Sequence, residues 1–140
     1  MARFVGLLLL ASLAACSSST GPEHLSFEGK STVSPAVPMD VQTVVTVRNR
    51  GDKTTQINTN ICGHPILAFT TPERDGARVW QSYDPSIIQC FGAVILATLA
   101  PGDYYDFRLT GTIPPTLPSG VYYLAVDING KRVPAGQFSK

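Results

Sequence analysis

Hydrophobic and polar residues alternate with a period of two over much of residues 24–140. In the clearest run, residues 41–49, every second residue from Val41 to Val47 is Val or Thr, and polar residues dominate the alternate positions. This alternation in β-branched residues is typical of a strand with one buried face. The same pattern predicts strands at 25–33, 41–49, 54–62, 66–69, 78–83, 93–99, 105–109, 120–128 and 131–138.

Turn signals separate the predicted strands. Gly51 lies in a polar stretch, 49–53, and predicts a turn that joins strands 41–49 and 54–62 as a hairpin. Asn129-Gly130 is the strongest hairpin signal in the chain and predicts that 131–138 pairs with 120–128. The Pro-rich segment 113–118 predicts a crossover between sheets.

These strands predict an all-β fold, since no segment has helical periodicity. About eight or nine short strands at this spacing indicate an immunoglobulin-like antiparallel β-sandwich with Greek-key connections, and an antiparallel β-barrel is the alternative. Gly and Pro together number 23, and charged residues make up 15% of the chain. Typical domains have about 25% charged residues, so this composition also favours a turn-rich β domain.

The first fifteen residues have a different pattern. Arg3 precedes an uncharged run of twelve residues, 4–15, which as a helix would be about 18 Å long. The hydrocarbon core of a bilayer is about 30 Å thick, so this run is too short to span it. A cation, a short apolar run and small residues at its end predict an export signal that is removed from the mature chain.

The end of this signal, Leu13-Ala14-Ala15-Cys16, resembles the lipobox of bacterial lipoproteins. The resemblance implies cleavage before Cys16 and a diacylglycerol, with acyl chains such as palmitate, on the Cys16 sulfur. We therefore expect a signal peptide at 1–15, a lipidated flexible tether at 16–23 and one sandwich domain at 24–140. Ser17 follows the cysteine, and in a two-membrane bacterium this implies an outer-membrane anchor facing the periplasm.

With Cys16 assigned to lipid, Cys62 and Cys90 remain as an even pair. In an oxidising compartment such a pair predicts a disulfide. Closing a loop of about 29 residues stabilises by roughly 3.5 kcal/mol in the chain-entropy model. A metal site or a catalytic thiol is the alternative, but His24 and His64 do not supply the matched ligand spacing that zinc needs.

Charge and motifs argue against several functions. Removal of Arg3 leaves 10 Lys and Arg against 10 Asp and Glu, a formal net charge of zero that argues against nucleic-acid binding. His64 is the only plausible general base, and no nucleophile motif accompanies it. We predict no catalytic residue, no metal site and no cofactor.

Two loops are candidates for binding. The segment between the cysteines includes Tyr83, Ile87 and Ile88, and a loop fixed at both ends binds a partner at lower entropic cost. The alternative is that Ile87 and Ile88 fold under the sandwich as a lid. Thr116 and Leu117 in the Pro-rich crossover form the second candidate loop.

Four sequence markers follow in order: 47–51 (Val-Arg-Asn-Arg-Gly), 76–80 (Gly-Ala-Arg-Val-Trp), 99–103 (Leu-Ala-Pro-Gly-Asp) and 118–122 (Pro-Ser-Gly-Val-Tyr). Their order and spacing resemble the BsuPI-type intracellular proteinase inhibitor domain, a small immunoglobulin-like sandwich. The resemblance covers roughly residues 41–128 and implies the fold and a proteinase partner. It includes no reactive-site motif, and the export signal and cysteine pair differ from an intracellular protein.

The sequence therefore predicts a lipid-anchored, non-catalytic binding module of the bacterial envelope. Its expected partners are the membrane, through Cys16, and a protein, with a proteinase as one candidate. A structural or assembly accessory that joins an envelope complex by strand addition is the alternative. A hydrolase with an unrecognised site is a third and weaker hypothesis.

Overall fold

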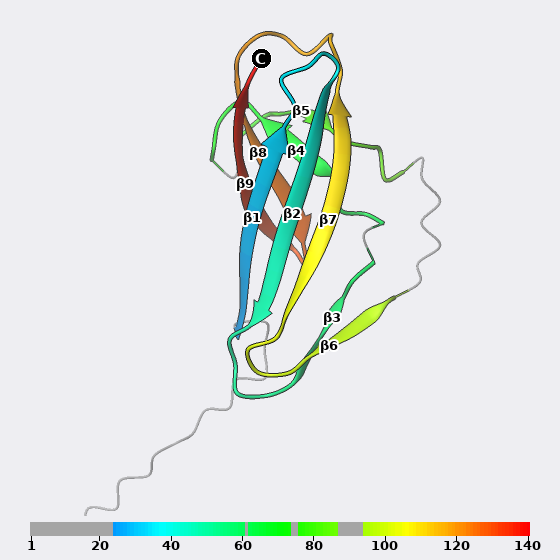
Figure 1. Ribbon diagram of the computed structural model, residues 1–140, viewed down its shortest axis with the longest axis vertical. Coiled ribbons are helices and arrows are strands. Elements are labelled where there is room, and N and C mark those ends of the chain that lie inside the picture. The colour runs from blue at the N-terminus through cyan, green and yellow to red at the C-terminus, as the bar shows by residue number, and fades with distance from the viewer. Residues whose placement is uncertain (1–23, 61, 74–75, 87–93) are drawn as a thin grey trace, which may run out of the picture.

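The computed structural model describes residues 24–60, 62–73, 76–86 and 94–140 of the 140-residue chain (Figure 1). The described residues form nine strands. They are β1 (Leu25–Val33), β2 (Met39–Asn49), β3 (Thr55–Asn58), β4 (Ile66–Phe69), β5 (Arg78–Gln81), β6 (Leu96–Leu99), β7 (Tyr104–Ile113), β8 (Val121–Ile128) and β9 (Lys131–Ser139).

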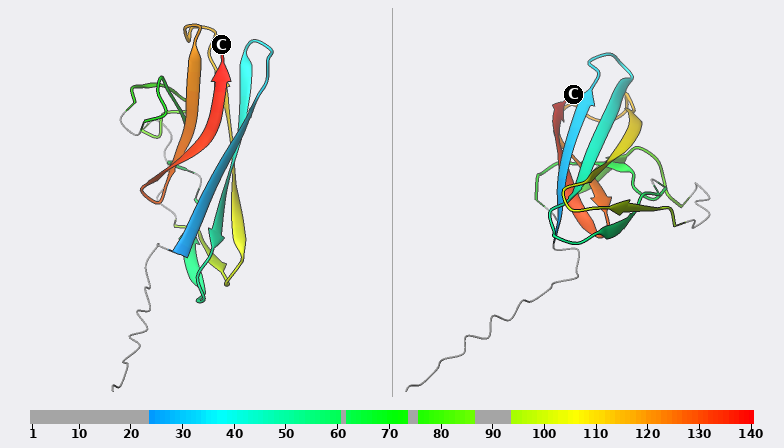
Figure 2. Two further views of the ribbon diagram at one scale, coloured as in Figure 1. Left: turned by 90° about the vertical axis from the view of Figure 1, so that its left-hand side faces the viewer. Right: turned by 60° about the horizontal axis from the view of Figure 1, so that its bottom comes forward.

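The strands form two facing sheets and a small ribbon, all antiparallel. One sheet has the order β1-β2-β7, the other has the order β5-β4-β8-β9, and β3 pairs with β6 as a two-stranded ribbon. Figure 2 shows the two larger sheets as separate layers. The described residues form no closed barrel, so the sandwich prediction is confirmed and the barrel alternative is wrong.

The strand order is that of an immunoglobulin-like domain. In the usual letters, β1, β2 and β7 correspond to A, B and E, while β5, β4, β8 and β9 correspond to C′, C, F and G. Tyr122, at the start of β8, donates a hydrogen bond from its hydroxyl to the Pro118 carbonyl at 2.7 Å. This is the tyrosine corner, a hallmark of strand F in such domains.

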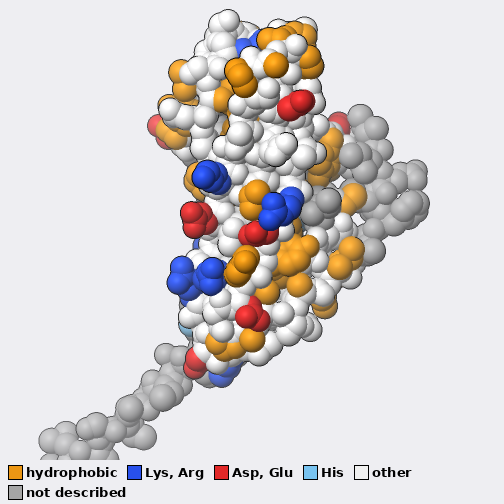
Figure 3. Space-filling view, viewed as in Figure 1, with side chains coloured by type: hydrophobic (Ala, Val, Ile, Leu, Met, Phe, Trp, Pro, Cys, Tyr) orange, Lys and Arg blue, Asp and Glu red, His pale blue; other side chains and the backbone are white. Residues whose placement is uncertain are grey.

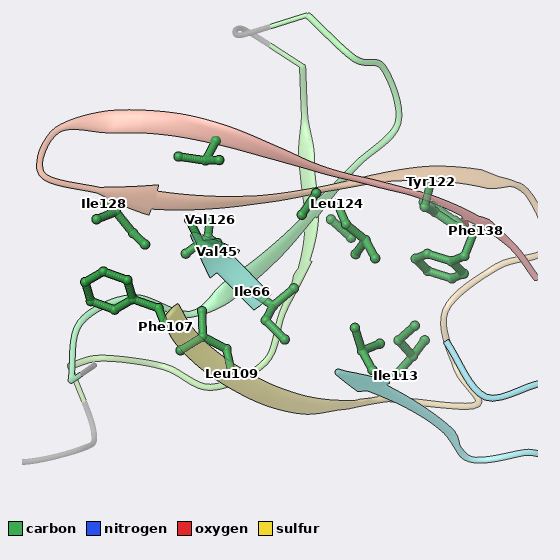
Figure 4. Close-up of a cluster of buried hydrophobic side chains, with 14 of the residues drawn as sticks. Val45, Ile66, Phe107, Leu109, Ile113, Tyr122, Leu124, Val126, Ile128 and Phe138 are labelled. Atoms are coloured by element: carbon green, nitrogen blue, oxygen red, sulfur yellow. The ribbon is translucent and has the colours of Figure 1, made fainter. Parts of the chain in front are cut away.

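Alternation along β2 produces the core on one face of its sheet. Val41, Val45 and Val47 are fully buried, whereas Asp40 and Gln42, on the other face of the strand, are exposed. The facing sheet contributes β4 and β8 side chains, and the two sets interdigitate (Figure 4). The largest fully buried hydrophobic side chains are Phe107, Ile66, Ile113, Leu124, Ile128, Val41, Val45, Val47 and Val126. Trp80, the last residue of marker 76–80, is half-buried and packs against this core.

The predicted hairpin between 41–49 and 54–62 is wrong. β3 is shorter, Thr55–Asn58, and pairs with β6 instead. Both edges of β2 are already occupied, by β1 and by β7, so no edge remains for β3. Buried Asn49 also redirects the chain, because its Nδ2 donates to the carbonyls of Lys53 at 2.7 Å and Leu99 at 3.0 Å.

The second predicted hairpin is confirmed, with one addition that the pattern did not reveal. Asn129 and Gly130 have φ values of 51° and 72°, as a type I′ turn requires, and β9 pairs with β8. The register shifts near Leu124, where Gly136 has φ of 105°. This bulge keeps Phe138 in the core, where it stacks on Tyr122 at 5.3 Å between ring centroids.

Candidate functional site

The first candidate loop is described only in part. Tyr83 is half-buried, and its hydroxyl accepts a hydrogen bond from the Gly63 amide at 3.2 Å. This bond ties the chain after β5 to the segment before β4. Ile87, Ile88 and Cys90 lie outside the described residues, and so does Cys16.

The cysteine pairing therefore stays a prediction. Cys62 is half-buried, and its amide donates to Asn60 Oδ1 at 2.9 Å. The segment that carries this cysteine thus has local hydrogen bonds of its own before β4 begins.

The second candidate loop needs a correction. Leu117 is only 7% exposed and belongs to the core, so the prediction that it contacts a partner is wrong. The Lys140 ammonium donates to the carbonyls of Pro115 and Leu117, which fastens the crossover to the end of the chain. Thr116 is exposed beside it. Packing of the crossover under the sandwich end explains the buried leucine.

Candidate catalytic groups do not come together. His64 is half-buried, its Nδ1 lies 2.7 Å from the Asp127 carbonyl oxygen, and its ring meets Phe107 edge-on at 6.1 Å. No Ser, Thr or Cys side chain among the described residues is hydrogen bonded to it. Within the same residues, no group of three or more His, Cys, Asp or Glu is placed to hold a metal ion.

Asp103 and Asp106 are carboxylates three residues apart in the sequence, and each has a structural partner. Asp103 Oδ2 accepts from the Ala100 amide at 3.0 Å and closes the turn before β7. Asp106 Oδ1 accepts from the Thr46 hydroxyl at 2.7 Å across the β2–β7 ladder. Neither arrangement resembles a pair of working carboxylates.

Three of the four sequence markers have visible structural roles. Markers 47–51 and 99–103 bind one another: the Asn49 amide donates to the Asp103 carbonyl, and the Gly102 amide donates to the Asn49 carbonyl, both at 2.9 Å. Marker 118–122 forms the tyrosine corner. These markers therefore stabilise the fold, and they present no feature specific to a proteinase.

A recess that sequence reasoning missed lies on the outer face of the β5-β4-β8-β9 sheet. Its volume is about 270 Å³. Strands β4, β8 and β9 and the segment after β4 line it, with Phe69, Thr71, Pro72, Glu73, Tyr123, Leu124, Ala125, Arg132, Pro134, Gly136 and Gln137. A second recess of about 360 Å³ shares Pro72, Arg132 and Pro134 with it and continues to Lys131 in the β8–β9 hairpin. We call the two together the outer groove.

The floor of the outer groove is apolar because β4 is buried on both faces. Leu67, Phe69 and Ala125 form a second buried cluster, separate from the main core. Register places Leu67 opposite Ala125 and Phe69 opposite Tyr123. The signal for this face was present in the sequence, since all four residues of 66–69 are apolar and a strand with one solvated face would alternate.

Charged groups stand at the rim of the outer groove. The Arg132 guanidinium lies 4.5 Å from the Phe69 ring centroid and makes two bonds to the Asp127 carboxylate, at 2.9 and 3.0 Å. This fork holds the cation over the apolar floor. Glu73 also lines the groove, and the hydrogen bond from the Thr71 side chain lowers the pKa of its carboxyl.

No family model matches the chain, and no curated protein matches it. In the described part of the chain, no helix has the length and apolar character needed to cross a bilayer.

Proposed function

We propose that this chain is a lipid-anchored, non-catalytic binding module of the bacterial envelope and that it engages a protein partner through the outer groove. The outer groove is the observation that supports a binding role. It has an apolar floor, charged side chains at the rim and exposed neighbours such as Gln137. Concave apolar surfaces with a few fixed polar groups are the usual form of binding sites.

The anchor in this proposal is the lipid on Cys16. Support comes from the export signal and the lipobox-like tetrapeptide that ends in this cysteine. Two or more acyl chains give stable membrane attachment, which one chain does not. In a two-membrane host, Ser17 favours the outer membrane, with the domain in the periplasm.

The proposal also includes a disulfide between Cys62 and Cys90. An exported domain meets an oxidising compartment, and two cysteines remain once Cys16 carries lipid. The bond would fasten the segment before β4 to the segment before β6. A thiol titration of the unfolded, unreduced mature protein should find no free cysteine.

The positions of the candidate catalytic groups support a non-catalytic role. His64 contacts a carbonyl and an aromatic ring, Asp103 closes a turn, and Asp106 bonds across the β2–β7 ladder. A nucleophile with an adjacent base is the minimum that covalent catalysis needs.

Two kinds of partner remain. The resemblance to BsuPI-type inhibitors suggests a proteinase, whereas an accessory role suggests a subunit of an envelope complex. We favour the accessory role, because the groove lies on a sheet face and the markers behind the resemblance stabilise the fold. Assay of the purified mature protein against a panel of serine proteinases separates the two, since inhibition at micromolar concentration would favour the inhibitor.

Expression of Cys16→Ser in the native host tests the anchor. The wild-type protein should fractionate with membranes and carry acyl groups by mass spectrometry, and the variant should be soluble or retain residues 1–15. Membrane fractionation of Cys16→Ser identical to that of the wild type would refute the anchor.

A further inference from the structure

One exposed apolar surface has no role in the outer groove or in the core. Val94, Ile95 and Leu96 are consecutive aliphatic residues, and they are 65%, 56% and 54% exposed. We call these three residues the apolar ridge. Hydrophobic side chains gather at the lower right of Figure 3, where Figure 1 places β3 and β6. A run of exposed aliphatic side chains indicates an interaction surface.

The backbone holds the apolar ridge in an ordered conformation. The Ile95 carbonyl accepts hydrogen bonds from the Thr59 amide at 2.7 Å and from the Thr59 hydroxyl at 3.1 Å. Leu96 pairs with Asn58 in the β3–β6 ribbon. The side chains of Ile95 and Leu96 are therefore presented to solvent by paired backbone.

The β3–β6 ribbon, which carries the apolar ridge, lies at the same end of the domain as the start of β1 (Figure 1). His24, the first described residue, accepts a hydrogen bond at its carbonyl from the Arg50 amide at 2.7 Å. The adjacent Asn49 binds the Leu99 carbonyl at 3.0 Å, at the end of β6. From Leu99 back to Val94 an extended chain covers at most about 17 Å.

The tether is long enough to bring this end of the domain to a membrane. Seven residues, 17–23, lie between Cys16 and the domain, and the eight steps from Cys16 to His24 reach at most about 28 Å when fully extended. A bilayer that holds the lipid of Cys16 is thus within reach of the apolar ridge. Tethering also raises the effective concentration of the domain at the surface, so a weak contact is sufficient for docking.

We propose that the apolar ridge docks into the interface of the lipid bilayer that holds the anchor and so fixes the orientation of the domain on the membrane. This inference rests on the proposed lipid anchor. Charge contributes little, because Arg48, Arg50 and Lys53 at this end are nearly balanced by Asp52 and Asp103, which leaves one net positive charge. We therefore expect docking to persist at high salt, unlike attachment by a basic patch.

The test uses the lipidated mature protein in vesicles of phosphatidylethanolamine and phosphatidylglycerol that contain brominated phosphatidylcholine. Ile95→Trp adds a fluorophore to the apolar ridge, and Thr32→Trp adds one at the opposite end of β1 as a matched control. Native Trp80 stays in all proteins, so the added signal is the difference from the wild type. We expect bromine to quench about half of the added fluorescence at position 95 and to leave position 32 unchanged.

A second pair of variants tests the chemistry of the contact. Val94→Asp with Leu96→Asp, in the Ile95→Trp protein, should abolish the quenching, whereas Thr98→Asp, exposed on the same strand, should preserve it. Circular dichroism should show that all variants remain folded.

The outcomes distinguish this inference from the proposed anchor. Flotation of the protein with vesicles, without quenching at position 95, overturns docking and leaves the anchor intact. Equal quenching at positions 95 and 32 also overturns it, as does an oligomer in which position 95 is shielded from bromine. A protein that does not float at all overturns both the anchor and docking.

Discussion

The outer faces of the two sheets differ in polarity, although both sheets are antiparallel and contribute side chains to the same core. The β1-β2-β7 face is polar: its exposed residues include charged side chains of both signs among neutral ones (Figure 3). Its hollow of about 330 Å³ is lined by Asp40, Gln42, Thr110 and Thr112 among others, and Thr112 donates to Asp40 at 3.1 Å. The β5-β4-β8-β9 face instead has a buried apolar cluster below an open groove.

This difference shows where the sandwich has an apolar cluster in addition to its main core. Water hydrates the polar side chains of the β1-β2-β7 face, so the alternation of buried and exposed residues alone explains that face. The cluster of Leu67, Phe69 and Ala125 packs outside the core and gives the opposite face a concave apolar surface. We therefore place partner binding on the second face.

The largest expected effect is on stability, at the floor of the outer groove. Phe69 is 5% exposed, so Phe69→Ala should lower the free energy of unfolding by about 3 kcal/mol. Val44→Ala, half-buried on the polar face, should lower it by less than about 1 kcal/mol. Urea unfolding of both variants measures the contrast, and equal losses would show that the two faces do not differ in packing.

The bulge in β9 should give the next effect, because it belongs to the grooved sheet alone. Gly136 has φ of 105° and open space around its Cα, so Gly136→Ala should cost about 1–2 kcal/mol through backbone strain. Gly120→Ala is the matched control, since a Cβ there meets only ordinary contacts at 3.5 Å or more. Thermal unfolding of the two variants should differ, and a stable Gly136→Ala would argue against the bulge.

The ion pairs of the two faces should differ by a smaller amount. Arg132 is 29% exposed and forks onto Asp127, whereas Arg108 is 76% exposed and lies 3.6 Å from Asp106. Arg132→Met should cost about 1 kcal/mol, and Arg108→Met should be nearly neutral. Urea unfolding of both variants tests this prediction. A larger loss of stability for Arg108→Met than for Arg132→Met would contradict it.

The smallest effect concerns the carboxylate at the groove rim. The Thr71 side chain lowers the pKa of Glu73 in the folded protein, so its contribution to stability is present above the unfolded pKa and is lost as pH falls through the folded pKa. Thr71→Val should raise the NMR titration midpoint of Glu73. An unchanged midpoint would show that the Thr71 side chain does not lower the pKa of Glu73.

The sequence predicted most of the fold, because burial on one face leaves a period-two pattern. It located β2 and the β8–β9 hairpin for this reason. It failed for β3, since the partner of a short strand depends on which edges other strands have occupied. Buried Asn49 gave no signal, because its partners Lys53 and Leu99 are set by the fold.

The candidate site was harder to predict than the fold. Leu117 looked like an exposed loop residue, but the crossover packs its side chain into the core. The outer groove is built from β4, β8 and β9, and only their pairing brings Phe69, Tyr123 and Arg132 together. The apolar run at 66–69 is typical of a strand covered on both faces. It does not indicate which strands pair with it.

The most direct test of the account compares the two faces in living cells of the native host. A photo-crosslinking residue replaces Gln137 at the outer groove or Arg108 on the polar face, in the full chain with its signal. We expect a discrete protein adduct from position 137 that Tyr123→Ala abolishes, and none from position 108. An adduct from position 108 with none from position 137 would contradict it.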